Sequence, residues 1–260
     1  MKLLIPAVAL TAATLFSPLA AQAQTTTYAG NGATGFGGEV GLGTITVSET
    51  SAGAITFGLA LGNGKTSQDG NASIYYIDSV PNSGFQDTST LRDSGTNADS
   101  VGITGGNGST VAYFAPGFKA DYAVAFQDTY LDLFKLNNDG TITYLNGNGN
   151  PAAPNAYQFT FNAADIGITA TSPFSFVGTL LSKPYRSNET FGTSTTVVDP
   201  NNPNAAPNAG DKGSVTFSNF NTFTPLAAAP EPGSMVPLAM GALALGGLVI
   251  ARRRTASAAE

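Results

Sequence analysis

Apolar and polar residues alternate in short runs along most of this chain. In the runs that begin at Ala54 and Tyr157, every second residue is apolar, which is the period of a half-buried β-strand. Segments rich in Gly and Asn separate the runs, as expected for turns. The pattern predicts an all-β domain, most simply a jelly-roll-like β-sandwich. The strands are expected at residues 44–47, 54–61, 73–80, 100–104, 109–114, 122–127, 130–136, 141–145, 157–162, 174–181, 194–198 and 214–223.

The strongest local signal lies between residues 130 and 145. Two alternating runs flank Asn137-Asn138-Asp139-Gly140, whose residues tolerate positive φ, so a β-hairpin is predicted. The leucines of the first run cannot all lie on one face, which predicts a bulge or an end effect near Lys135. A calcium loop through Asn137, Asn138 and Asp139 is the alternative, but further acidic ligands are missing from the spacing, so a plain turn is expected.

The first 23 residues have the pattern of a secretory signal peptide. Lys2 precedes an apolar stretch that ends in Ala21-Gln22-Ala23, with small residues at the two positions that signal peptidase must accommodate. Cleavage is therefore expected before Gln24. The predicted partners are the Sec translocon and signal peptidase.

The C-terminal thirty residues have the pattern of a second targeting segment. Pro230-Glu231-Pro232 precedes an uncharged apolar run at 235–251, which as a helix would extend about 25 Å, close to the minimum for a bilayer. Arg252, Arg253 and Arg254 follow, and basic flanks stay cytoplasmic. A single transmembrane helix is predicted, with its C-terminus and the tail 255–260 in the cytoplasm.

The order and terminal position of these parts resemble the PEP-CTERM sorting signal of Gram-negative bacteria. The resemblance covers residues 230–254 and implies that Pro230, Glu231, Pro232 and the arginines are read by an exosortase, which cuts near Pro-Glu-Pro. It implies transient anchoring in the inner membrane, followed by release to the cell surface or extracellular matrix. It also implies exopolysaccharide, in biofilm or floc, as the ligand of the exported part.

Composition narrows the chemistry of the exported part. The chain carries a net charge of −6, and four of its 11 basic residues lie in the two terminal segments, so nucleic acid and anionic membrane surfaces are disfavoured as partners. It contains no Cys and no His. Disulfides, Ser-His-Asp and Cys-His sites and the common zinc sites are thereby excluded. No cofactor or metal is expected.

One segment combines charge, amide and aromatic groups most densely. Tyr185, Arg186, Asn188 and Glu189 follow a Lys-Pro break and are expected on a loop at one end of the sandwich, where they could bind carbohydrate. The alternative is that Arg186 and Glu189 pair locally while Tyr185 and Phe191 cover the edge of the core.

Catalysis would require two carboxylates a few ångströms apart, as in glycoside hydrolysis. Spacing selects no pair among the acidic residues, so a non-enzymatic protein is predicted and a carboxylate-dependent glycan hydrolase or lyase is the alternative. A purely structural role is the third hypothesis. The available carboxylates are Glu39, Glu49, Glu189, Asp78, Asp121, Asp128 and Asp132.

The predicted organisation is a signal peptide at 1–23, an exported β-domain at 24–224, a stalk at 225–229 and the sorting signal at 230–254. Two segments, 150–156 and 202–209, share Ala-Ala-Pro-Asn-Ala and are expected as exposed loops of one domain.

Overall fold

The computed structural model describes residues 24–93, 102–106, 110–148, 157–182, 185–198 and 213–225. The predicted signal peptide, the sorting signal with its apolar span, and the loops at 150–156 and 202–209 lie outside these ranges. All described residues belong to one compact unit, Ala23–Ala227. No helix within the described ranges has the length and apolar character needed to span a membrane.

The described chain is all-β, as the sequence predicts. Its helical parts are a short turn at 102–106 and the 3-10 helix η1 at Ala163–Ile166. The strands are β1 (Gln24–Ala29), β2 (Thr44–Glu49), β3 (Ala54–Ala60), β4 (Ala72–Asp78), β5 (Ala112–Tyr113), β6 (Tyr122–Gln127), β7 (Tyr130–Leu136), β8 (Ile142–Asn148), β9 (Tyr157–Asn162), β10 (Phe174–Ser182), β11 (Tyr185–Phe191), β12 (Ser194–Val198), β13 (Ser214–Phe217) and β14 (Asn221–Phe223).

The first sheet is antiparallel, with strand order β1-β2-β3-β9. Its strands alternate between buried and more exposed residues, as in Ile45, Val47 and Glu49 of β2 and Ile55 and Phe57 of β3. One face therefore packs against the interior and the other meets solvent.

The central sheet has the order β11-β10-β4-β6-β7-β8, and β14 pairs with β10. Its inner strands are buried on both faces, so successive residues of β4 enter different cores. Tyr75 and Ile77 pack into the core shared with the first sheet, whereas Ile74 and Tyr76 pack into a second core on the opposite face. Burial on both sides explains why β4, β6 and β10 are nearly continuous apolar runs.

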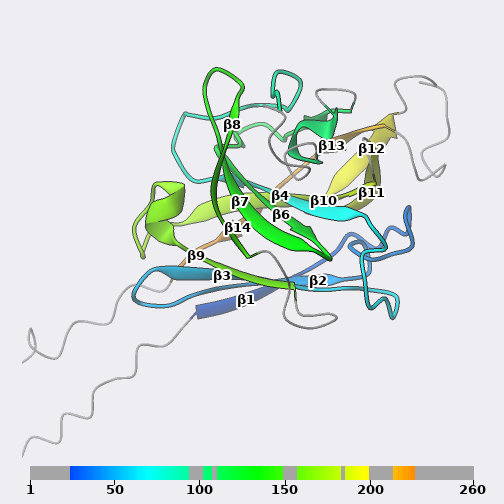
Figure 1. The fold of residues 1–260 in the computed structure, drawn as a ribbon, viewed down its shortest axis with the longest axis horizontal. Helices are drawn as coiled ribbons and strands as arrows, with labels where there is room; N and C mark the ends of the chain where they lie inside the picture. Colours follow the sequence, from blue (N-terminus) through cyan, green and yellow to red (C-terminus); the bar gives the residue numbers. More distant parts are fainter. Residues whose placement is uncertain are drawn as a thin grey trace, which may run out of the picture. The chain divides into compact units, whose positions relative to one another are not determined.

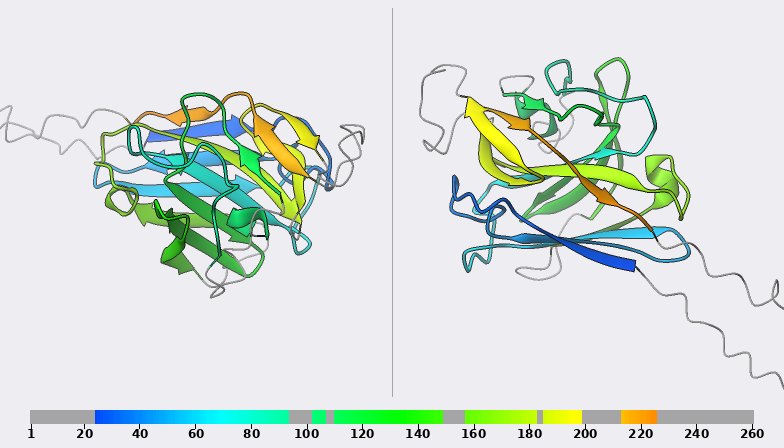
Figure 2. Two further views of the ribbon diagram at one scale, coloured as in Figure 1. Left: turned by 90° about the horizontal axis from the view of Figure 1, so that it is seen from above. Right: turned by 180° about the vertical axis from the view of Figure 1, so that it is seen from behind.

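The two cores separate three layers. Figure 1 and the right-hand view of Figure 2 show β1, β2 and β3 lying across one face of the central strands. The opposite face is covered by the small sheet β12-β13-β5 and by segments outside the sheets, which contribute Leu91, Ile103 and Phe118 to the second core. The sheets are thus packed in a sandwich-like manner.

Most predicted strands are confirmed, and β6, β7, β9 and β12 have the expected bounds. Three expectations are wrong. Residues 102–104 are helical rather than extended, only Ala112–Tyr113 of the segment 109–114 is a strand, and the predicted strand 214–223 is divided into β13 and β14. β1 and β11 were not predicted as strands.

The hairpin between β7 and β8 is confirmed. Gly140 has a positive φ of 85°, and the Asp139 carboxylate accepts hydrogen bonds from the backbone N–H and hydroxyl of Thr141. These bonds explain why aspartate is favoured at this position of the turn. The predicted irregularity is a register shift between Leu133 and Phe134, close to its expected position at Lys135.

Candidate functional site

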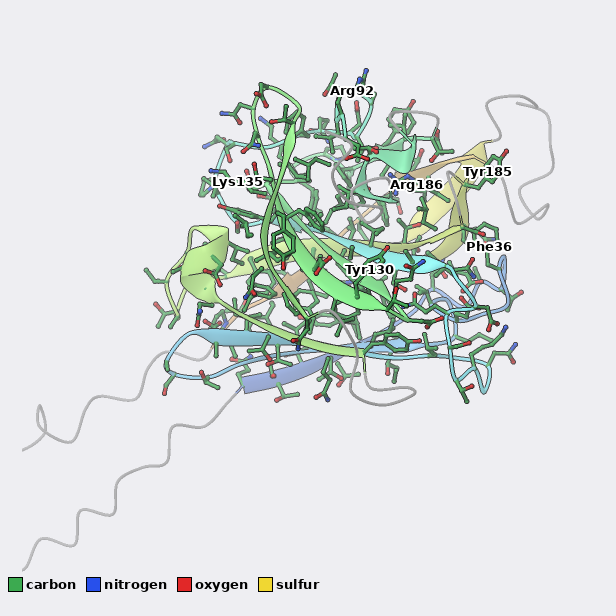
Figure 3. All side chains as sticks on the ribbon, in the orientation of Figure 1. Phe36, Arg92, Tyr130, Lys135, Tyr185 and Arg186 are labelled. Carbon is green, nitrogen blue, oxygen red and sulfur yellow. The ribbon has the colours of Figure 1, made fainter. Side chains whose placement is uncertain are left out.

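The predicted carbohydrate loop is in fact a strand. Tyr185, Arg186, Asn188 and Glu189 lie in β11, which pairs with β10, and the loop expectation is therefore wrong. Arg186 and Glu189 are fully buried, while Tyr185 and Asn188 are partly exposed. Figure 3 shows Arg186 directed toward the interior and Tyr185 near the periphery.

Arg186 and Glu189 do not pair, because they face opposite sides of the strand. The Arg186 guanidinium lies over the Tyr76 ring, with Cζ 5.6 Å from its centroid, and Nη2 donates to the Ile103 carbonyl at 3.2 Å. Nε and Nη1 of Arg186 have no hydrogen-bond partner. Its positive charge is stabilised mainly by the aromatic face and one carbonyl.

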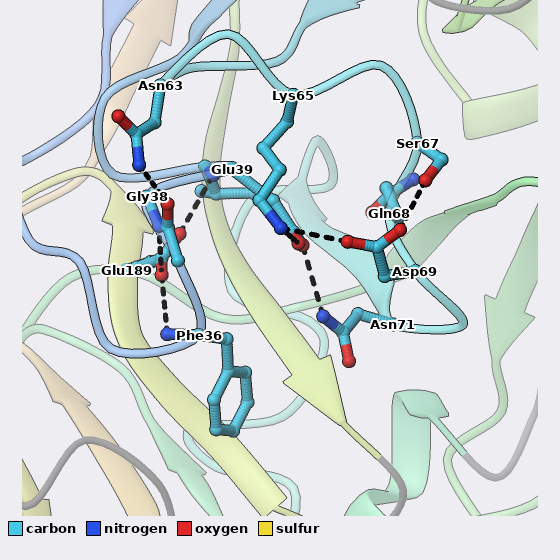
Figure 4. A network of polar contacts seen from close by, with 12 residues as sticks. Phe36, Gly38, Glu39, Asn63, Lys65, Ser67, Gln68, Asp69, Asn71 and Glu189 are labelled. Carbon is cyan, nitrogen blue, oxygen red and sulfur yellow. Dashed lines mark hydrogen bonds and ion pairs between the residues drawn. The ribbon is translucent and has the colours of Figure 1, made fainter.

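The Glu189 carboxylate is enclosed by the loop between β1 and β2. Oε1 accepts from the backbone N–H groups of Phe36 and Gly38 at 2.7 and 2.9 Å, and Oε2 accepts from those of Val40 and Gly41 at 2.9 and 3.2 Å. Figure 4 shows this arrangement. Four converging N–H groups form an anion-binding nest, which a carboxylate of the same chain already fills.

Two glycines allow the nest to form. Gly38 has a φ of +84°, which turns the backbone so that the N–H groups of Gly38 and its neighbours converge on the Glu189 carboxylate. At Gly41 a Cβ atom would lie 1.9 Å from the carbonyl oxygen of Ala33, so a side chain does not fit. The long-range partner Glu189 gives these two glycines their role.

A second buried carboxylate, Glu39, lies beside the nest. Lys65 Nζ is 3.5 Å from its Oε1 and 2.8 Å from the Asp69 carboxylate, and Asn71 donates to Oε2 at 3.1 Å. Burial raises the pKa of Glu39, while Asn71 and Lys65 oppose the increase and the nearby Glu189 adds to it. Glu39 and Glu189 are thus one of the carboxylate pairs that the fold brings together.

A second pair is Asp78 and Asp121. Asp121 accepts from the backbone N–H groups of Ser79 and Val80 and from the Ser83 hydroxyl, and Asp78 accepts from the Lys119 N–H at 2.9 Å. Burial raises the pKa of Asp78, with a smaller contribution from Asp121. These bonds tie loops to β4.

The remaining candidates for acid-base chemistry lie apart. Asp128 accepts from the Tyr157 hydroxyl and from the Gln68 N–H, Asp132 is buried in β7, and Glu49 is buried in β2. Among the described residues, no group of three or more acidic side chains could hold a metal ion. Most of these carboxylates accept hydrogen bonds that fasten one segment of the backbone to another.

The surface offers a different polar and aromatic site on β8. Its residues 143–146 are all exposed, although the neighbouring β7 is almost entirely buried. Tyr144 is 48% exposed and packs edge-on against Phe134, with ring centroids 5.8 Å apart. Asn137 donates to the hydroxyls of Thr141 and Thr143 at 3.0 and 2.8 Å, which orders the hairpin.

Close packing at Gly147 fixes the far end of this strand. A Cβ atom there would lie 1.8 Å from Asp132 Oδ1 and 2.9 Å from the Tyr144 hydroxyl. Glycine therefore lets β8 approach β7, while about half of the Tyr144 side chain stays exposed. The sequence marked Tyr144 only as a strand residue. Its exposure depends on β8 being the last strand of the central sheet.

Comparisons with protein-family models, with curated proteins and with solved structures give no match to this chain.

Proposed function

We propose that this chain is an exported, exosortase-sorted, non-enzymatic β-protein of the cell surface or extracellular matrix that binds exopolysaccharide. The proposed export route rests on the sequence. A signal peptide at 1–23 has the small residues Ala21 and Ala23 at its cleavage site, and a PEP-CTERM-like signal lies at 230–254. In this proposal the precursor is held in the inner membrane by the span 235–251 and is then released. The delivered domain is the jelly-roll-like sandwich expected at 24–224.

Binding is assigned to β8 rather than to β11. The observation that carries this assignment is the exposed run 143–146, which includes the aromatic ring of Tyr144. An exposed aromatic ring can stack on the apolar face of a sugar ring, and hydroxyl and amide side chains elsewhere on the strand can bond to sugar hydroxyls. Phe134 holds the ring edge-on, so little side-chain entropy would be lost on binding.

The structural use of the carboxylates supports a non-enzymatic role. A glycosidase needs one carboxyl group to donate a proton and a second carboxylate to act as base or nucleophile. Glu189 already accepts four backbone hydrogen bonds, and Glu39 beside it is fully buried. A hydrolase or lyase built on this pair remains the second proposal, because the two carboxylates do lie together.

A glycan array with the unit 24–227 tests the binding role. We expect polysaccharide retention that falls about ten-fold in the Tyr144→Ala variant, because an aromatic anchor is lost. Tyr113→Ala is the matched control, since Tyr113 is 44% exposed but lies in β5, and it should bind as the unaltered protein does.

Two results would contradict the proposal. Polysaccharide binding that falls equally in the two tyrosine variants, or that changes in neither, would show that β8 is not the binding site. Release of reducing ends that stops in a Glu39→Gln variant would favour the hydrolase instead.

A further inference from the structure

Glu49 is a buried carboxylate with no partner. Its side chain is 3% exposed, and neither Oε1 nor Oε2 has a hydrogen-bond partner. It follows Ile45 and Val47 on the inward face of β2, where an apolar residue would be expected. A buried carboxylate without a partner is costly in its charged form, and either protonation or a neighbouring cation relieves the cost.

The neighbours of Glu49 on both strands are uncharged. Ile55 lies opposite it on β3, and Gln24 lies opposite it on β1. Burial is the one cause of the rise in the Glu49 pKa to about 7, and among the described groups no charged side chain contributes. The Gln24 carboxamide oxygen is also buried without a partner.

The register places the predicted cleavage point beside this carboxylate. Gln24 is the first residue of β1 and is the direct cross-strand partner of Glu49. Directly opposed residues of antiparallel strands have Cα atoms about 5 Å apart, so the backbone nitrogen of Gln24 is within reach of a glutamate side chain. In the uncut chain that nitrogen is an uncharged amide.

We propose that removal of residues 1–23 completes this site, because the new α-ammonium group of Gln24 forms an ion pair with the Glu49 carboxylate. Signal peptidase hydrolyses the Ala23–Gln24 amide, consuming one water and leaving a carboxylate on Ala23 and an amine on Gln24. Protonation of that amine supplies the cation that Glu49 lacks. The mature protein is thereby stabilised relative to its precursor. The inference rests on the proposed export, specifically on cleavage before Gln24.

A thermodynamic cycle tests the ion pair on purified chains of defined N-terminus. The unit closes its own hydrophobic cores, so it can be studied without the terminal segments. Chains that begin at Gln24 or at Ala21 are made with Glu49 or with Glu49→Gln and unfolded in urea at pH 7. In the longer chain, Glu49→Gln should raise the unfolding midpoint, because it removes an unpaired buried charge. In the chain that begins at Gln24, the same substitution should not raise the unfolding midpoint.

Cyclisation of the N-terminal glutamine gives a control of the same length. The amine attacks its own carboxamide, ammonia leaves, and the resulting lactam carries no charge. The cyclised chain should behave as the longer chain does. NMR titration should place the Glu49 pKa near 7 in both, and well below 7 in the chain with a free amine.

The same rise in midpoint for Glu49→Gln in all three chains, with one unchanged Glu49 pKa, would overturn the inference. N-terminal sequencing of secreted protein tests the cleavage separately. If secreted protein begins elsewhere while the cycle shows coupling, the proposed route is wrong and the ion pair stands as a property of the fold.

Discussion

Replacing Glu189 by glutamine is expected to destabilise the folded unit by about 3–5 kcal/mol. The carboxylate accepts four backbone N–H groups from the loop between β1 and β2. A carboxamide presents its own NH2 donor to two of them, so buried donors would face one another. Since small domains are stable by only about 5–15 kcal/mol, the variant should be marginally folded.

Urea unfolding measures this loss, and Asp69→Asn is the matched control. Asp69 is also acidic and bonded, but its side chain is 57% exposed, so its replacement should change stability far less. Glu189→Asp should lie between the two, because the shorter side chain cannot reach all four donors. A loss for Glu189→Gln no larger than for Asp69→Asn would show that the nest does not hold the loop.

Truncating Phe57 to alanine is expected to cost about 3–5 kcal/mol. Its ring lies between the two large sheets and contacts Phe161 of the first sheet and Tyr75, Phe174 and Phe176 of the central sheet, with centroid separations of 5.5–6.2 Å. Removing it leaves a cavity where the sheets meet. The melting temperature should fall by roughly 10 °C.

Leu42→Ala is the control for this variant. Leu42 is apolar but 47% exposed, so its truncation should change stability by less than about 0.5 kcal/mol. Similar small losses for Phe57→Ala and Leu42→Ala would contradict the packing of the two sheets against one another.

The sequence predicted the strands best where burial leaves a local pattern. β2, β3 and β9 have one solvated face and alternate visibly, and β4, β6 and β10 are continuous apolar runs because both faces are covered. β11 could not be found in this way. Its Arg, Ser, Glu and Thr residues are buried because distant segments supply their partners, and local composition contains no sign of those partners.

The candidate site was predicted less well for the same reason. The 185–189 segment has the residue types of a sugar site, yet the nest around Glu189 forms from residues about 150 positions earlier in the chain. Conversely, Tyr144 looked like an ordinary strand residue. Only the position of β8 at the end of the central sheet exposes it. Exposure depends on the tertiary arrangement, which periodicity does not encode.

The intact mass of the protein recovered from the cell surface or medium of a Gram-negative host with an exosortase tests the central claim most directly. We expect a chain that begins at Gln24 and ends near Pro230–Pro232, and a Glu231→Ala variant that keeps its C-terminal segment. Recovery of residues 1–260 uncut inside the cell, or equal processing of the Glu231→Ala variant, would contradict the proposed export and sorting.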